Sequence, residues 1–186
     1  MTNGLTQAER ERVTNYLAEA HDQVLQSVRN FSAEQLDFKP EPDRWSISEN
    51  VEHLTIVHNL ILSHIEQVTV SLSSSKESGW KSRDDALLEE VKNRRTPLEA
   101  PEILWPKNQL QHEELFQRFE AVRDRLREFA ATNNAPLRSL CFPHPVYGEL
   151  DCHQWLLLMG AHCERHLAQI REVTSSADFP TLVRNG

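Results

Sequence analysis

The sequence predicts an all-α fold, namely a four-helix bundle with a long crossover between its second and third helices. Glycine occurs only 5 times among 186 residues, so residues that interrupt helices are scarce. Four long segments carry apolar residues at steps of three and four, which places them on one helix face. The hydrophobic fraction of 39% and the charged fraction of 26% are typical of a folded globular protein. A chain of this length is expected to form a single domain over residues 1–186.

The first helix is expected to run from about residue 6 to residue 30. Thr6 and Glu9 have the spacing of a capping box, in which each side chain satisfies a free backbone N–H at the helix start. The apolar stripe of this segment consists of Val13, Leu17, Ala20, Val24 and Val28. Residues 32–35 could form one extra turn, and the two prolines that follow prevent a helix from continuing.

A second capping-box spacing, Ser46 and Glu49, predicts a helix that reaches about Leu72. Its apolar stripe consists of Leu54, Val57, Ile61, Ile65, Val68 and Leu72. Residues 73–108 differ in kind, because they contain a serine run, two tryptophans and three prolines, although residues 85–92 could form a short helix. So long a connection is expected to pack on the bundle or to cover a site.

Helical periodicity resumes from about residue 109 to residue 131, with Leu115, Phe119, Val122, Leu126 and Phe129 on one face. A proline-rich turn region covers residues 136–148. The last helix is expected to run from Glu149 to about Thr174. These two segments complete the predicted bundle.

Nine histidines are many for this length, and the informative pair is His162 and His166 in the last helix. A step of four residues advances about 400° around a helix and about 6 Å along it, so both imidazoles project from one face. Two histidines placed in this way can share a metal ion. The spacing also arises by chance in a pair of hydrogen-bonded or partly exposed histidines, and the residues alone leave both interpretations open.

A third ligand would come from the second helix, where either His53 or His64 could join the pair. His58 lies about 140° around the helix from His53 and therefore faces elsewhere. The distances of these residues from the ends of their helices favour His53 as the third ligand if the two helices run antiparallel. If the helices run parallel, His64 is the less poorly placed of the two. Periodicity does not decide the direction. A surface or satisfied-core role is predicted for His21, His58, His112, His144 and His153, the last of which points away from the pair.

Several function classes are disfavoured by composition. The chain has 28 acidic and 20 basic residues, and its formal charge of -8 disfavours binding to nucleic acid or to an anionic membrane. No apolar run approaches the length of a membrane span, and no N-terminal secretory signal is evident, so a cytoplasmic location is expected. The cysteines Cys141, Cys152 and Cys163 are odd in number and lack CxxC spacing, which predicts free thiols. No phosphate-binding loop or serine-nucleophile motif occurs.

Three segments carry a family resemblance. The first is RWSISENVEHL at residues 44–54, and the second is PLEAPEILWP at residues 97–106. The third is HPVYGELD at residues 144–151, which leads into Trp155 and AHCERHLAQI at residues 161–170. In their order and separations, over nearly the whole chain, these segments resemble the DinB/YfiT-like superfamily of metal-dependent four-helix bundles.

The resemblance implies that His53, His162 and His166 form a three-histidine site for one divalent metal ion. Zinc, nickel, iron and manganese are candidates, because imidazole suits several such ions. Three protein ligands leave positions open for water or substrate, as in catalytic sites. The resemblance also implies homodimers and a small-molecule substrate.

The resemblance further implies an enzyme that transfers a low-molecular-weight thiol to a small electrophile. A metal-dependent hydrolase and a non-catalytic stress-response or ligand-binding bundle are the alternatives. The groups that orient the imidazoles are expected among Glu49, Glu52 and Gln169. No residue is assigned as a catalytic general base, because none is placed well enough by its position in the sequence.

Overall fold

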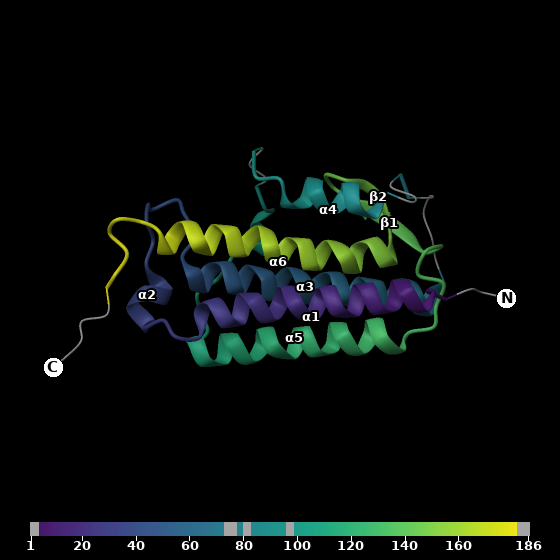
Figure 1. Ribbon diagram of the computed structural model, residues 1–186, viewed down its shortest axis with the longest axis horizontal. Helices are drawn as coiled ribbons and strands as arrows, with labels where there is room; N and C mark the ends of the chain where they lie inside the picture. The colour runs from purple at the N-terminus through teal and green to yellow at the C-terminus, as the bar shows by residue number, and fades with distance from the viewer. Residues whose placement is uncertain (1–3, 73–77, 80–82, 96–98, 182–186) are drawn as a thin grey trace.

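The computed structural model describes residues 4–72, 78–79, 83–95 and 99–181. Four long helices lie side by side as a bundle (Figure 1). They are α1 (Gln7–Val28), α3 (Ile47–Ser71), α5 (His112–Thr132) and α6 (Cys152–Thr174). The shorter elements are α2 (Ala33–Asp37), α4 (Asp84–Lys92), the 3-10 turn η1 (Glu102–Leu104), and the strands β1 (Cys141–His144) and β2 (Gly148–Asp151). The predicted all-α bundle with a long connection between its second and third long helices is confirmed.

The capping boxes that the sequence predicts are formed. Thr6 and Glu9 exchange hydrogen bonds at the start of α1, and Ser46 and Glu49 do so at the start of α3. A third box, formed by Ser32 and Gln35, starts the short helix α2. Each box satisfies two backbone N–H groups that the first helical turn leaves without a partner.

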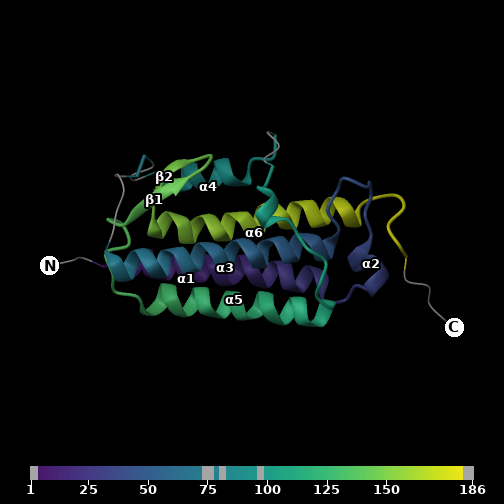
Figure 2. The same ribbon diagram turned by 180° about the vertical axis from the view of Figure 1, so that it is seen from behind.

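The structure shows whether the second and the last long helices run parallel or antiparallel, which periodicity leaves open. Helices α1 and α6 run one way along the bundle, and α3 and α5 run the other way (Figures 1 and 2). Helix α6 packs against both α1 and α3, and α5 packs against the same two helices on the other side. Because α3 and α6 are antiparallel neighbours, the start of α3 lies beside the second half of α6.

The predicted apolar stripes form the core. The stripe of α1 is buried throughout, and so is that of α3 except at Leu72, which is 59% exposed. Leu72 lies just beyond the last residue of α3 and has a left-handed backbone (φ 51°), so it no longer follows the stripe. In α5, four of the five predicted residues are buried and Phe129 is partly buried.

The last helix begins at Cys152, three residues later than the predicted start at Glu149. Glu149, Leu150 and Asp151 belong to strand β2, which pairs antiparallel with β1 so that Cys141 lies opposite Asp151. Asp151 then caps α6 through a capping box with Gln154. The hairpin was not predicted because its two four-residue strands show no alternation of buried and exposed side chains.

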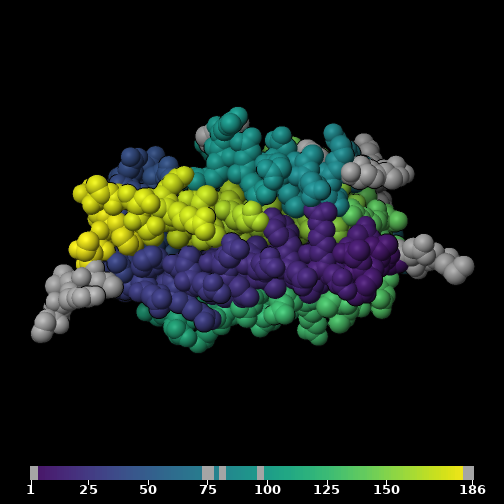
Figure 3. All heavy atoms as spheres, viewed as in Figure 1, coloured from purple at the N-terminus to yellow at the C-terminus, as the bar shows by residue number. Residues whose placement is uncertain are grey.

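The crossover packs on the bundle, as predicted. Helix α4 lies against α6, and in the space-filling view the crossover covers one edge of that helix (Figure 3). The side chain of Arg165 donates hydrogen bonds to the backbone oxygens of Val91 and Asn93, which fixes the end of α4. The serine run at residues 73–75, Trp80 and Pro97 lie outside the described residues. None of the described helices has the length and apolar character of a membrane span.

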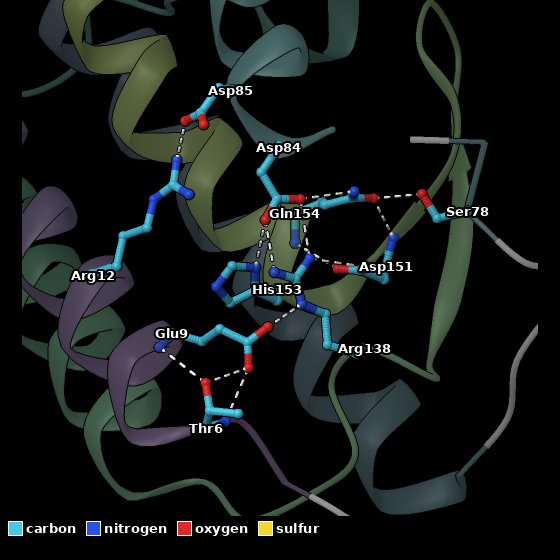
Figure 4. Close-up of polar contacts among 10 residues, drawn as sticks. All are labelled: Thr6, Glu9, Arg12, Ser78, Asp84, Asp85, Arg138, Asp151, His153 and Gln154. Carbon is cyan, nitrogen blue, oxygen red and sulfur yellow. Dashed lines mark hydrogen bonds and ion pairs between the residues drawn. The ribbon is translucent and has the colours of Figure 1, made fainter. Parts of the chain in front are cut away.

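One arginine ties several elements together near the hairpin (Figure 4). The guanidinium of Arg138 donates to Glu9 on α1 at 2.8 Å and to Asp84 on α4 at 2.6 Å. It also donates to Asp151, the cap of α6, at 3.3 Å. The ring of His153 is fully buried beside this network, with Nδ1 3.8 Å from Asp84.

Candidate metal centre

His53, His162 and His166 come together between α3 and α6. One ring nitrogen from each lies within 4.8 Å of the other two, and Nε2 of His162 is 3.0 Å from Nε2 of His166. The ring centre of His53 lies 5.2 Å from that of His162 and 4.8 Å from that of His166. The alternative candidate, His64, instead packs against Phe142, with ring centres 4.4 Å apart. The antiparallel arrangement thus brings His53, rather than His64, to the level of the pair.

Hydrogen bonds fix the protonation of two of the rings. Nδ1 of His53 lies 2.8 Å from the backbone oxygen of Leu104 in η1, and a carbonyl can only accept. Nδ1 of His166 lies 2.8 Å from Oδ1 of Asn50, whose amide nitrogen donates to the backbone oxygen of Ser46. Both Nδ1 atoms therefore carry the proton, and both Nε2 atoms keep a lone pair.

These orienting groups are not the residues Glu49, Glu52 and Gln169 that the sequence suggests. Glu49 and Glu52 hold Asn108 of the crossover, each through a hydrogen bond of 2.9 Å. Oε1 of Gln169 is buried without a hydrogen-bond partner among the described residues. Asn50 could have been found, because it lies three residues before His53 and so on the same face of α3. The Leu104 carbonyl comes from an irregular segment that no periodicity places.

Burial keeps the three rings neutral. His53 and His166 are each 4% exposed, whereas His162 is partly exposed. Desolvation lowers the pKa of His53 and holds the pKa of His162 and His166 well below the ordinary value. Trp45 covers one side of the site. The centre of its ring lies 4.7 Å from the ring centre of His53 and 6.0 Å from that of His166, on which it stacks. The imidazoles are therefore in the neutral form that metal coordination requires.

The remaining nitrogen of His162 faces another histidine. Nδ1 of His162 lies 3.3 Å from Nε2 of His58, and Nδ1 of His58 lies 3.0 Å from Nε2 of His21. His58 and His21 are both fully buried. Of the two roles predicted for these histidines, the satisfied-core role is the one they have.

The donor set fits a divalent metal ion. Imidazole is a suitable ligand for zinc, nickel and iron, so the donor set does not by itself identify the metal. Among the described residues, a second group with ligand spacing consists of His21, His58 and Cys163, all of them buried. No carboxylate of the described residues joins the three histidines at ligand spacing, which leaves coordination positions for other molecules.

A surface groove of about 560 Å³ lies between α3 and α5. Its lining includes Ile56, Val122 and Arg125, but none of the three clustered histidines. The groove is on the side of α3 that faces α5, whereas His53 is on the side of α3 that faces α6. The groove therefore does not reach the histidine cluster, in which His162 is the partly exposed residue.

Comparison with known proteins places the chain in a family. The family model described as the DinB superfamily matches residues 16–170. An uncharacterized protein of Bacillus subtilis (strain 168), YuaE, is 26% identical over 156 residues, which cover 83% of this chain and 93% of YuaE.

The fold also matches a solved structure, that of YfiT from Bacillus subtilis, described as a probable metal-dependent hydrolase with an unusual four-helix bundle topology. The TM-score is 0.58 at 16% identity, over 91% of this chain and 88% of YfiT. This likeness shows a shared bundle, and the family match spans most of the chain. The chain belongs to the DinB superfamily.

Proposed function

We propose that the protein binds one divalent metal ion through His53, His162 and His166 and uses it to convert a small-molecule substrate. The observation that carries the proposal is the cluster of three neutral imidazoles, with ligand atoms within 4.8 Å of one another. Two of these rings are held by Leu104 and Asn50 so that Nε2 is unprotonated. Outer hydrogen bonds of this kind are what metal-binding histidines usually make.

A bound divalent ion would supply Lewis acidity that lowers the pKa of a coordinated water or thiol. The chain itself contributes orientation and shielding. Asn50 and the backbone oxygen of Leu104 prevent the rings of His166 and His53 from turning. The indole of Trp45 covers both rings and keeps bulk water from that side. His162 is the partly exposed residue of the three, so a substrate would approach from its side.

Hydrolysis is the reaction we favour. Water is a nucleophile that requires no second substrate, and the fold resembles that of YfiT, described as a probable metal-dependent hydrolase. Transfer of a low-molecular-weight thiol to an electrophile is the second candidate. The same three neutral ligands leave the full charge of the ion available to acidify a thiol. A bundle that binds a ligand without turnover is the third candidate.

The test is a substrate screen with the metal-loaded protein and with His162→Ala treated in the same way. Ester, amide and phosphoester substrates are tested with water alone, and electrophiles are tested with and without added thiols. We expect hydrolysis that needs the loaded metal and is lost in the variant. Turnover only with a thiol would favour transfer, and metal binding without either reaction would favour the non-catalytic role. The homodimer that the family resemblance implies and the cytoplasmic location expected from the sequence remain predictions, and light scattering on the purified chain tests the first.

A further inference from the structure

A line of hydrogen bonds, which we call the relay, crosses the bundle from α1 to the histidine cluster. Nδ1 of His21 on α1 lies 2.7 Å from the backbone oxygen of Leu17. Nε2 of His21 lies 3.0 Å from Nδ1 of His58 on α3, and Nε2 of His58 lies 3.3 Å from Nδ1 of His162 on α6. His21 and His58 have no exposed surface, so their partners must come from within the bundle.

The direction of every bond in this line follows from its first member. The carbonyl of Leu17 can only accept, so Nδ1 of His21 carries the proton and Nε2 of the neutral ring is an acceptor. Nδ1 of His58 must then donate to His21, which makes Nε2 of His58 an acceptor in turn. His162 therefore donates from Nδ1, and its Nε2 has no proton.

This protonation decides what His162 presents to His166. Their Nε2 atoms are 3.0 Å apart, and the hydrogen bond to Asn50 leaves His166 with a lone pair on Nε2. Two lone pairs that face each other at this distance repel, and a cation between them removes the repulsion. If His162 carried its proton on Nε2 instead, it would donate to His166, and the pair would satisfy itself without a cation.

We propose that His21 and His58 are positioning residues that hold His162 in the Nδ1–H form, so that its Nε2 is free to bind metal. The inference rests on the proposed metal site and concerns residues that do not touch the ion. The line reaches from α1 through α3 to α6, so three of the four long helices set the protonation of one ligand. Without His58, the proton of His162 can move to Nε2, where it takes the place of the lone pair that would bind the metal.

The same residues could be considered a second metal site, because Cys163 lies at ligand spacing from His21 and His58. An ion bound there through Nδ1 of His58 would require the proton of that ring on Nε2, directed at Nδ1 of His162. His162 would then carry its own proton on Nε2 and would be lost as a ligand of the first site. The two sites therefore exclude each other. The hydrogen bond to Leu17 leaves a lone pair on Nε2 of His21 in both arrangements, so the Cys163→Ala variant below distinguishes them.

The first test uses the unaltered protein. Long-range ¹H–¹⁵N NMR of the metal-free chain with labelled histidines assigns the proton of each ring. We expect His21, His58 and His162 each to carry it on Nδ1. A proton on Nε2 of His162 would overturn the proposal without any variant having to fold. This outcome is independent of metal loading, so it is distinguishable from failure of the proposed function.

The second test measures zinc affinity by competition with a chelating dye in His58→Leu, His58→Gln and Cys163→Ala. The Leu variant lacks an acceptor for His162, and we expect it to lose about 10- to 100-fold in affinity. The Gln side-chain oxygen can accept from His162, so that variant should stay within a few-fold of the unaltered protein. Cys163→Ala should bind as the unaltered protein does. Unchanged affinity in His58→Leu, or a large loss in Cys163→Ala, would overturn the relay, whereas absence of zinc from the unaltered protein would contradict the proposed function instead.

Discussion

The side-chain oxygen of Asn50 accepts a hydrogen bond of 2.8 Å from Nδ1 of His166, across the interface of α3 and α6. Asn50 is 1% exposed, and its amide nitrogen is held by the backbone oxygen of Ser46 at 2.7 Å. Both ends of the amide are therefore committed, and the ring of His166 can present only Nε2 to the cluster. A buried asparagine with this role should matter for metal binding more than for the fold.

We predict that Asn50→Leu lowers zinc affinity by about 10- to 100-fold, the usual effect of losing an outer hydrogen bond to a metal ligand. Competition titration with a chelating dye measures the change. Asn59→Leu is the matched control, because Asn59 is on the same helix but bonds to Thr55 and Arg125 rather than to a histidine of the cluster. Equal losses in the two variants would show that the orientation of His166 is not the cause.

Arg138 should be a major contributor to stability. Its side chain pairs with Asp84 and Asp151, whose side chains are only 10% and 5% exposed. Arg138→Leu leaves these two carboxylates buried without their cation, and we expect the free energy of unfolding to fall by about 3 kcal/mol. Urea denaturation measures the loss.

Arg12→Leu is the control for Arg138, because it removes an ion pair with Asp85 in which the side chains are 41% and 87% exposed. An exposed pair contributes about 1 kcal/mol or less, so this variant should be nearly as stable as the unaltered protein. Similar losses in the two variants would mean that burial of the carboxylates does not determine the cost.

His153 should make the fold sensitive to acid. Burial, together with the charge of Arg138, lowers the pKa of His153 to about 4 from the ordinary 6.5, despite the carboxylates of Asp84 and Glu9. At pH values between about 4 and 6.5, the ring of His153 binds a proton in the unfolded chain but not in the folded chain. The free energy of unfolding therefore falls as the pH is lowered from 6.5 to 4. Asp151 has the opposite effect on stability. Burial raises its pKa to about 6, so its carboxylate binds a proton at a higher pH in the folded chain than in the unfolded chain.

We predict that, between roughly pH 7 and pH 5, the free energy of unfolding of His153→Leu changes by about 2 kcal/mol in the stabilising direction relative to that of the unaltered protein, because the contribution of His153 is removed while that of Asp151 remains. At pH 7 the variant should be close to the unaltered protein in stability. The reason is that neither ring nitrogen of His153 has a hydrogen-bond partner among the described residues. Urea denaturation at the two pH values tests this, and an unchanged pH dependence would show that His153 does not remain neutral in the folded chain.

Gly160 allows α1 and α6 to approach closely. A Cβ atom at this position would lie 2.6 Å from the ring of Tyr16, well inside ordinary contact. Alanine improves helix propensity by about 1 kcal/mol, whereas overpacking costs about 1 to 3 kcal/mol. We expect Gly160→Ala to destabilise the protein by about 1 kcal/mol and to become stabilising in a Tyr16→Ala background. Thermal unfolding of the four proteins measures both effects, and stabilisation by Gly160→Ala alone would be the contrary result.

Much of the bundle follows from local rules. Thr6 and Ser46 mark the starts of their helices because a capping box needs only residues three apart. The pair His162 and His166 follows from helix geometry, and the family resemblance adds His53. These features can be predicted from one sequence because they depend on residues close together in the chain or on a recognisable motif.

The relay and the hairpin depend on tertiary structure. His58 lies on another face of α3 from His53, and in the bundle that face points toward His21 of α1. Which helices are neighbours cannot be derived from periodicity, because each stripe shows only that a face is buried. The Leu104 carbonyl is part of the crossover, and its position beside His53 depends on how that irregular segment folds back.

The most direct test of the metal site is the metal content of the purified chain beside His53→Ala, His162→Ala and His166→Ala. All four proteins are exposed equally to zinc, nickel, manganese and iron(II), and circular dichroism confirms that the helices remain. We predict one metal ion per chain in the unaltered protein and its loss in each variant. Metal retained in all three variants, or no metal in the unaltered protein under any loading, would contradict the three-histidine site.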